Sequence, residues 1–301
     1  MRILNYCAGY DTGGYSIRLK QAFDQHSTHE YRSLIGRPNN YIRYPIDASP
    51  RELRRLKAWA DLIHISHQPL TASDKPQVVQ YHGSKFRNNP GKFLTLQHQA
   101  GAQAVCSTID LWLIAPEMMT WLPSPYDPAW LAGFRQPIED GVFRVAHAPT
   151  ARAIKSTDHF LAAMTRLGKD IKCETVLIER KPWGQCLTMK GTADVYFDQV
   201  ILGYGNNAVE AWGMGIPVIA GAQPETIGEM RRRFGVLPFY EATEDTIYDA
   251  LLAMAEPATR AAYTKIGHKH FMEHHTAEAV VRTAEAVYHP AVLTEETTTH
   301  G

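Results

Sequence analysis

Short apolar runs alternate with longer amphipathic stretches along most of this chain. Runs rich in β-branched residues predict strands, and stretches with apolar residues at every third or fourth position predict helices. The predicted strands are 2–6, 31–35, 61–65, 77–81, 103–107, 142–147, 174–179, 193–197 and 216–220. The predicted helices are 15–25, 50–60, 96–102, 158–167, 183–190, 207–214 and 225–233, followed by a mostly helical stretch, 244–288, and a polar end, 294–301, predicted to be disordered. Strands that alternate with helices indicate an α/β protein with mostly parallel sheets.

Prolines crowd the stretch that separates the two alternating halves. They are Pro116, Pro123, Pro125, Pro128 and Pro137. Such stretches are typical of the boundary between domains, so we expect one domain over 1–137 and a second over 138–301. In open α/β sheets, ligands bind outside the carboxyl ends of the strands. We therefore expect ligand space at those ends.

Residues 204–221 read as a glycine turn, one helix, a second glycine and a buried strand. Asn207 suits the N-cap, and Glu210 then falls at the third helical position, the spacing of a capping box. Gly215 can take the left-handed conformation that ends a helix. Unpaired N–H groups at the helix start make residues 205–208 a candidate phosphate cradle. Because a carboxylate repels an anion, Glu210 in a nucleotide site would hold hydroxyls, such as those of a ribose.

Composition is ordinary and gives no positive signal for nucleic acid or a membrane as partner. The chain has 301 residues, 45% hydrophobic and 21% charged, which suits a globular protein of two domains. Lys plus Arg equals Asp plus Glu, 31 each, so net charge favours neither nucleic acid nor an anionic membrane. The four cysteines lie far apart, mostly in apolar runs, as buried thiols do in a reducing compartment. With no signal-peptide pattern and no apolar run near the ~20 residues of a membrane span, we expect a cytoplasmic protein.

Four segments carry a recognisable pattern. They are HAPTARAIKSTDHFLAAMTRL, ADVYFDQVILGYG, NNAVEAWGMGIPVIAG and the loop with Gly13 and Gly14. Together they resemble glycosyltransferases of the GT-B fold, most closely the retaining, nucleotide-sugar-dependent glycosyltransferase family 4. The resemblance is strong over 145–221 and thin in the first half, where VVQYHGSKFR adds to it. It implies two Rossmann-like parallel-sheet domains facing across a cleft, the first on the acceptor side and the second binding the donor, with a helix over 274–288 packed back on the first.

The resemblance implies roles for individual residues. Lys155 holds the position of the lysine that grips the donor diphosphate, and Glu210 that of the glutamate that binds the ribose. His82 corresponds to the histidine near the reacting face of the sugar. Gly13 and Gly14 match the loop that approaches the diphosphate from the other domain.

Two positions depart from the family pattern. The usual partner arginine falls on Thr150, and Arg152 is the substitute that we consider. The first of the two signature glutamates falls on Leu202, so contact with the transferred sugar must be altered or come from elsewhere. The other donor-binding candidates are Asp198, Gln199, Gly203, Tyr204, Gly205, Asn206 and Asn207.

The implied reaction moves a sugar from a UDP- or GDP-linked donor to an unidentified acceptor, whether protein, saccharide or small molecule. Charge that develops on the departing diphosphate must be met by cations or fixed dipoles. Lys155, Arg152 and the helix amides near Gly205 could do this, and the sequence contains no D-x-D metal signature. We therefore expect no metal or other cofactor, and under retention no carboxylate nucleophile is needed.

Several alternatives remain open. Leu202 in place of glutamate also suits a catalytically inactive nucleotide-sugar-binding protein of the same fold. The G-x-G-x-x-A spacing from Gly203 to Ala208 matches an NAD-dependent oxidoreductase fingerprint, although it does not directly follow a strand. HFMEH, residues 270–274, matches the zinc-protease pattern H-x-x-E-H close to the end of the chain. The assigned residues also have structural alternatives: capping for Glu210, solvated loop cations for Lys155 and Arg152, backbone pairing for His82, and turn geometry for Gly13 and Gly14.

Overall fold

The computed structural model describes residues 1–37, 47–71 and 73–296, and the chain divides into two compact units. One unit combines Met1–Pro125 with the segment that begins at Thr276, and the other is Tyr126–His275. The division comes before residue 137, where the proline stretch predicts it, because the chain from Tyr126 onward packs with the second unit. The Tyr126 N–H, for example, donates to the carbonyl of His275 at 2.8 Å.

The first unit is built on a six-stranded, entirely parallel sheet of order β2-β1-β3-β4-β5-β6. Its strands are β1 (Arg2–Tyr10), β2 (Glu30–Arg37), β3 (Leu62–Ser66), β4 (Gln77–Tyr81), β5 (Gln103–Cys106) and β6 (Thr120–Trp121). Its helices before the crossover are η1 (Thr12–Gly14), α1 (Tyr15–His26), η2 (Pro50–Glu52), α2 (Leu53–Trp59), α3 (Gly83–Arg87), α4 (Pro90–Gln99) and α5 (Ile109–Trp112). Strand β6 was not predicted, because it is very short and lies among the prolines.

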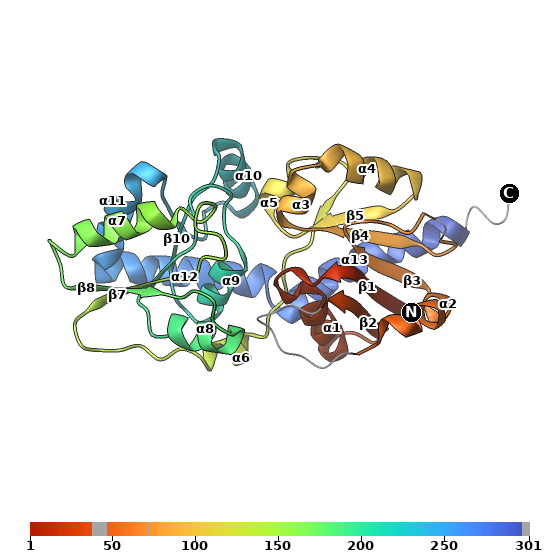
Figure 1. The fold of residues 1–301 in the computed structure, drawn as a ribbon, viewed down its shortest axis with the longest axis horizontal. Helices are drawn as coiled ribbons and strands as arrows, with labels where there is room; N and C mark the ends of the chain where they lie inside the picture. The colour runs from red at the N-terminus through yellow and green to blue at the C-terminus, as the bar shows by residue number, and fades with distance from the viewer. Residues whose placement is uncertain (38–46, 72, 297–301) are drawn as a thin grey trace. The chain divides into compact units, whose positions relative to one another are not determined.

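The last helix, α13 (Ala277–Glu296), returns to this first unit. Val280, Ala284 and Tyr288 are buried in one apolar cluster with Phe23 of α1, and Figure 1 shows α13 running alongside the strands. The hydroxyl of Tyr288 lies 2.6 Å from Nδ1 of His64 in β3. Residues 294–296 continue this helix where disorder was predicted, and residues 297–301 lie outside the described part of the chain.

The second unit has a five-stranded, entirely parallel sheet of order β11-β10-β9-β7-β8. Its strands are β7 (Phe143–His147), β8 (Cys173–Leu177), β9 (Val195–Phe197), β10 (Val218–Ala220) and β11 (Tyr240–Glu241). Its helices are α6 (Pro128–Ala132), α7 (Thr157–Leu167), α8 (Trp183–Lys190), α9 (Asn206–Gly213), α10 (Pro224–Phe234), η3 (Glu244–Thr246), α11 (Ile247–Ala255) and α12 (Pro257–His274). The predicted bounds of α8 match those observed.

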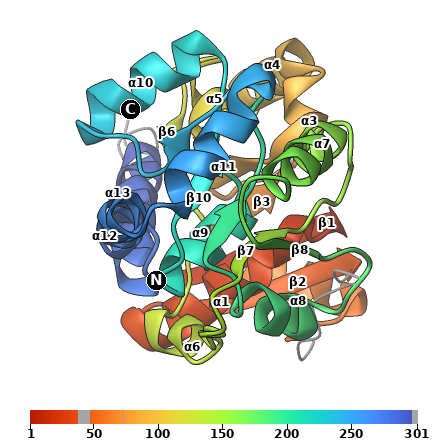
Figure 2. The ribbon, with the colours of Figure 1, turned by 90° about the vertical axis from the view of Figure 1, so that its left-hand side faces the viewer.

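Helices cover both faces of this second sheet. Phe160 of α7 and Leu251 of α11 are fully buried in one cluster with Val145 of β7, and Figure 2 shows α7 and α11 on one side of the strands and α8 on the other. A strand covered on both faces has no solvent-facing positions, so its sequence reads as a continuous apolar run rather than an alternation. All five residues of β7 are buried, including Arg144 and His147.

The strand order places two loops of each unit side by side. In the second sheet, β8 lies on one side of β7 and β9 on the other, so consecutive connections leave in opposite directions. The same reversal occurs around β1 in the first sheet, between β2 and β3. Ligands of open α/β sheets bind at such a switch point, outside the carboxyl ends of the strands. A ligand site in the second unit is therefore expected at the loops after β7 and β9.

None of the helices in the described ranges combines the length and apolarity that a bilayer span needs. All four cysteines are free thiols, of which Cys7 and Cys106 are buried and Cys173 and Cys186 are partly exposed.

Candidate functional site

Three of the predicted donor-site residues meet at the switch point of the second sheet. The ammonium of Lys155, in the loop after β7, lies 2.5 Å from Oδ1 of Asp198, the residue that follows β9. The other carboxylate oxygen of Asp198 accepts the N–H of Gly205 at 2.6 Å. Gly205 is the N-cap residue of α9. A cation, a carboxylate and the positive end of a helix dipole are thus joined at one point.

A second set of contacts fixes the loop that carries Lys155. His147, at the end of β7, donates from Nδ1 to the carbonyl of Phe197 at 2.9 Å, so its Nε2 accepts the hydroxyl of Thr157 at 2.8 Å. Burial lowers the pKa of His147 to about 4, which keeps the imidazole neutral in this role. Between Lys155 and α7, Ser156 adopts a left-handed backbone with φ 46°. Non-glycine residues rarely adopt this conformation, and it is concentrated at functional sites.

The start of α9 corrects one sequence-based prediction. Asn207 was expected at the N-cap, but α9 begins at Asn206 and Gly205 caps it. Glu210 therefore lies beyond the third helical position, and the predicted capping box is not formed. A side chain from outside the helix takes over, because the carboxylate of Asp198 accepts the Gly205 N–H. At the other end, Gly215 is confirmed as the left-handed residue, with φ 72°.

The carboxylate of Glu210 is buried and surrounded by donors. Its Oε1 accepts the indole N–H of Trp183 at 2.8 Å and the hydroxyl of Tyr126 at 3.3 Å. Its Oε2 lies 2.5 Å from the ammonium of Lys190. The same ammonium lies 2.8 Å from Oδ1 of Asn207. Each carboxylate oxygen can accept more than one hydrogen bond, so Glu210 keeps acceptor capacity for a ligand hydroxyl.

Other predicted residues point elsewhere. The guanidinium of Arg152 forms two hydrogen bonds with Glu179, at 2.9 and 2.8 Å, and its side chain is 48% exposed. The guanidinium of Arg152 is thus paired with Glu179 and is not part of the cluster around Lys155. The hydroxyl of Tyr204 lies 2.9 Å from Nε2 of His270 and 3.2 Å from Nε2 of His275, so this side chain faces the end of α12.

Backbone groups of Gln199 and Gly203 form hydrogen bonds with Gly221, the residue that follows β10. The N–H of Gly221 donates to the carbonyl of Gln199, and the N–H of Gly203 donates to the carbonyl of Gly221, both at 2.8 Å. Gly203 has φ 90°, a conformation that favours glycine. Leu202, which replaces the first signature glutamate, forms an isolated β-bridge with Ala222.

The first-unit candidates lie in loops after β1 and β4. Gly13 and Gly14 both have left-handed backbones, φ 60° and 70°, and Gly14 caps α1. His82 caps α3 and is buried. Burial, and then the neighbouring His67, His64 and Arg18, hold the pKa of His82 well below its usual range, so the ring is neutral near pH 7. Its centroid lies 4.7 Å from that of Tyr15.

Sequence reasoning missed Lys190, although a signal was present. Trp183, Leu187 and Lys190 fall four and three positions apart and so share one face of α8. Leu187 is fully buried, which places the lysine on the buried face as well. His147 also carried a signal, because it ends a predicted strand, at the edge where ligands of α/β sheets bind.

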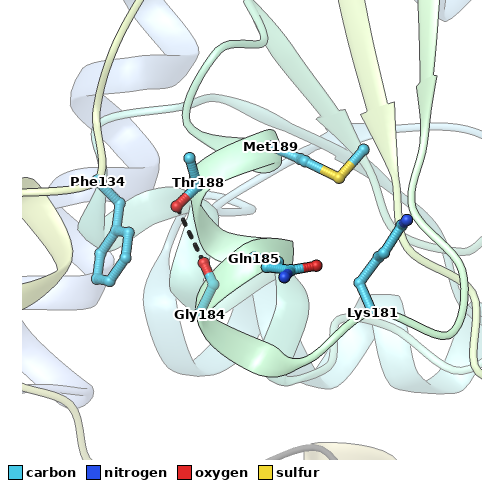
Figure 3. A pocket seen from close by; sticks show the side chains of 6 residues that line it. All are labelled: Phe134, Lys181, Gly184, Gln185, Thr188 and Met189. Atoms are coloured by element: carbon cyan, nitrogen blue, oxygen red, sulfur yellow. Dashed lines mark hydrogen bonds between the residues drawn. The ribbon is translucent and has the colours of Figure 1, made fainter.

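A shallow cavity of about 540 Å³ lies on the opposite, exposed side of α8 (Figure 3). Its lining residues are Phe134, Lys181, Gly184, Gln185, Thr188 and Met189. The hydroxyl of Thr188 donates to the carbonyl of Gly184 at 3.1 Å, so it is engaged within the helix. None of the sequence-predicted site residues lines this cavity.

The H-x-x-E-H pattern does not form a zinc site here. Within the described ranges, no three His, Cys, Asp or Glu side chains converge as metal ligands. His270 is 5% exposed and its Nε2 meets the Tyr204 hydroxyl.

Solved structures show which architecture these units build. A sucrose-phosphate synthase from Thermosynechococcus elongatus superimposes with a TM-score of 0.64 and 11% identity, over 97% of this chain and 99% of its own. A glycosyltransferase from Rickettsia africae ESF-5 gives 0.64 and 9%, over 97% and 98%. HepE from Anabaena, solved with UDP and glucose, gives 0.62 and 13%, over 95% and 99%.

The chain has the GT-B fold. No protein-family model matches the sequence, and no curated protein matches it. At such low identities, the likeness shows the GT-B fold alone, since one fold hosts many functions. The activity must be argued from the site.

Proposed function

We propose that this chain is a glycosyltransferase that moves a sugar from a UDP- or GDP-linked donor to an acceptor, with retention and without a metal. The observation that carries the proposal is the meeting of Lys155, Asp198 and the N-terminus of α9 at the switch point. In the transfer reaction the nucleoside diphosphate departs from the sugar as an anion. A lysine beside a helix N-terminus stabilises the negative charge that develops on it. HepE, of the same fold, has been solved with UDP-glucose.

In this proposal each residue has a defined part. Lys155 and the first amides of α9 meet the diphosphate, and Asp198 and Gln199 lie within reach of the transferred sugar. Glu210 accepts hydrogen bonds from the ribose hydroxyls. The resemblance adds Gly13 and Gly14 at the diphosphate and a neutral His82 at the sugar, and these roles remain predictions. Under retention, the departing phosphate assists deprotonation of the acceptor oxygen, and no enzyme nucleophile is required.

The location proposed for the protein is the cytoplasm. The four free thiols support this, because reducing compartments keep cysteines unpaired.

Thermal unfolding with a panel of nucleoside diphosphates and nucleotide-sugars, in EDTA, tests the proposal. A ligand at about 100 times its Kd stabilises the folded state by ~2.7 kcal/mol. We expect ligands that carry one particular base to raise the Tm in EDTA, and this increase to be lost in Lys155→Met. Transfer or hydrolysis of the same donor then separates an enzyme from an inactive binding protein, and the anomeric configuration of the product tests retention. If neither UDP nor GDP ligands shift Tm, with or without divalent cations, the proposal is wrong.

A further inference from the structure

Lys190 is a fully buried lysine that no sequence motif explains. It is the last residue of α8, and its side chain has an exposed fraction of 0%. Burying an ammonium group is strongly unfavourable unless it is paired and its hydrogen bonds are made. A lysine retained in such a place therefore has specific partners, and those partners indicate its role.

All three N–H groups of the ammonium have an acceptor. They are Oε2 of Glu210 at 2.5 Å, Oδ1 of Asn207 at 2.8 Å and the carbonyl oxygen of Asn207 at 3.2 Å. The ring of Tyr196, in β9, lies beneath the ammonium, 4.8 Å from Nζ to the ring centroid. Lys190 therefore joins the end of α8 to the first two turns of α9.

These contacts have a consequence for the carboxylate of Glu210. With Trp183 on Oε1 and Lys190 on Oε2, the carboxylate is held from both sides in one orientation. The lysine also supplies the counter-charge that a buried carboxylate requires. A carboxylate fixed in this way is a strong acceptor for neighbouring hydroxyls.

We propose that Lys190 is a positioning residue for ribose recognition, which acts by holding the carboxylate of Glu210 in place. This inference rests on the proposed function, because it takes the ligand of Glu210 to be the ribose of a nucleotide-sugar. Lys190 makes its contacts through Glu210 and Asn207 and touches neither Lys155 nor Asp198 in the described structure. The amides proposed to meet the diphosphate lie at the start of α9, where Asp198 accepts the N–H of Gly205. The main effect of Lys190 therefore falls on Glu210 and the ribose.

The test measures how well the protein distinguishes ribose from deoxyribose. Calorimetry gives Kd values for UDP and 2′-deoxy-UDP, or for the GDP pair if guanine is the bound base, and for inorganic pyrophosphate. A hydrogen bond to a charged group gives the ribonucleotide an advantage of about tenfold or more in wild type. In Lys190→Met this ratio is expected to fall to near one, while pyrophosphate affinity stays within about twofold. Lys169→Met, at an exposed lysine just after α7, is the matched control and keeps the wild-type ratio.

A comparison of two further variants covers the case in which Lys190→Met does not fold. The two variants are Glu210→Gln alone and Glu210→Gln combined with Lys190→Met. The double variant leaves no unpaired buried charge at this place. If the lysine acts through Glu210, both bind UDP equally within about twofold, and neither discriminates against deoxyribose. A retained ratio in Lys190→Met, or a double variant at least tenfold weaker than Glu210→Gln, overturns this inference alone. Wild-type protein that binds neither nucleotide overturns the proposed function, and this inference with it.

Discussion

The ammonium of Lys155 lies 2.5 Å from the carboxylate of Asp198, whose side chain has an exposed fraction of 0%. The carboxylate also accepts the N–H at the start of α9. An anion of the protein itself thus occupies the place where a diphosphate is proposed to bind. A diphosphate and this carboxylate compete for the same cation and the same helix terminus, and their mutual repulsion opposes binding.

Asp198→Asn is therefore expected to bind UDP and pyrophosphate more tightly, by about tenfold, because it removes that repulsion while keeping an acceptor for the Gly205 N–H. Calorimetry at fixed ionic strength measures the change. Asp194→Asn is the matched control, since Asp194 directly precedes β9 and Asp198 directly follows it. A loss of UDP affinity in Asp198→Asn as large as that in Lys155→Met would show instead that the carboxylate supports the bound diphosphate.

Lys155→Met is expected to lower the free energy of unfolding by about 3 kcal/mol, because it leaves the carboxylate of Asp198 buried without a counter-ion. Urea unfolding measures this. Adding Asp198→Asn to the same chain should restore most of the loss. Arg152→Met is the contrasting variant: its ion pair with Glu179 is open to solvent, so we expect a much smaller cost than for Lys155→Met. Equal costs for the two single variants would contradict the buried pair.

Acid should destabilise the protein through two buried histidines of the first unit. Burial lowers the pKa of His64 to about 3 and that of His67 to about 4. In the unfolded chain these two histidines bind protons below pH ~6.5, and in the folded chain they stay neutral until a lower pH. Their contribution to the free energy of unfolding is therefore complete above pH ~6.5 and falls as the pH drops. At pH 5 the loss is about 2 kcal/mol for each histidine.

Urea unfolding at pH 7.5 and pH 5 measures that loss. His64→Asn keeps a polar atom near the hydroxyl of Tyr288 but does not titrate, so it should lose about 2 kcal/mol less than wild type between the two pH values. An unchanged difference would mean that His64 protonates in the folded protein.

Gly221→Ala should be strongly destabilising, by about 3 kcal/mol or more. A Cβ on Gly221 would lie 1.9 Å from the carbonyl oxygen of Ala242, a backbone atom that cannot move aside cheaply. Gly228→Ala is the control, because its added Cβ meets nothing within 4 Å and lies inside α10. There alanine should stabilise by about 0.5–1 kcal/mol. Thermal unfolding of both variants checks the opposite signs, and two losses of similar size would contradict the packing at Gly221.

Local sequence signals were sufficient for most elements of this fold. The α8 bounds and the left-handed Gly215 follow from side-chain periodicity and from backbone freedom, both of which act within one turn. The α/β class, with parallel sheets, follows from the alternation of apolar runs and amphipathic stretches. The very short strands β6 and β11 could not be predicted, because a strand of two residues has no periodicity to detect.

Sequence patterns alone were enough to predict the set of elements and the loops that carry polar residues. Which of those residues pair depends on how the elements pack in the fold. Asn207 has a good N-cap side chain, yet α9 starts one residue earlier, with Asp198 of a different loop accepting the capping N–H. Glu210 fits a capping box in sequence, yet its partner is Lys190 at the end of another helix. The counter-charge of a buried group can come from a distant part of the sequence, and no local pattern shows which residue supplies it.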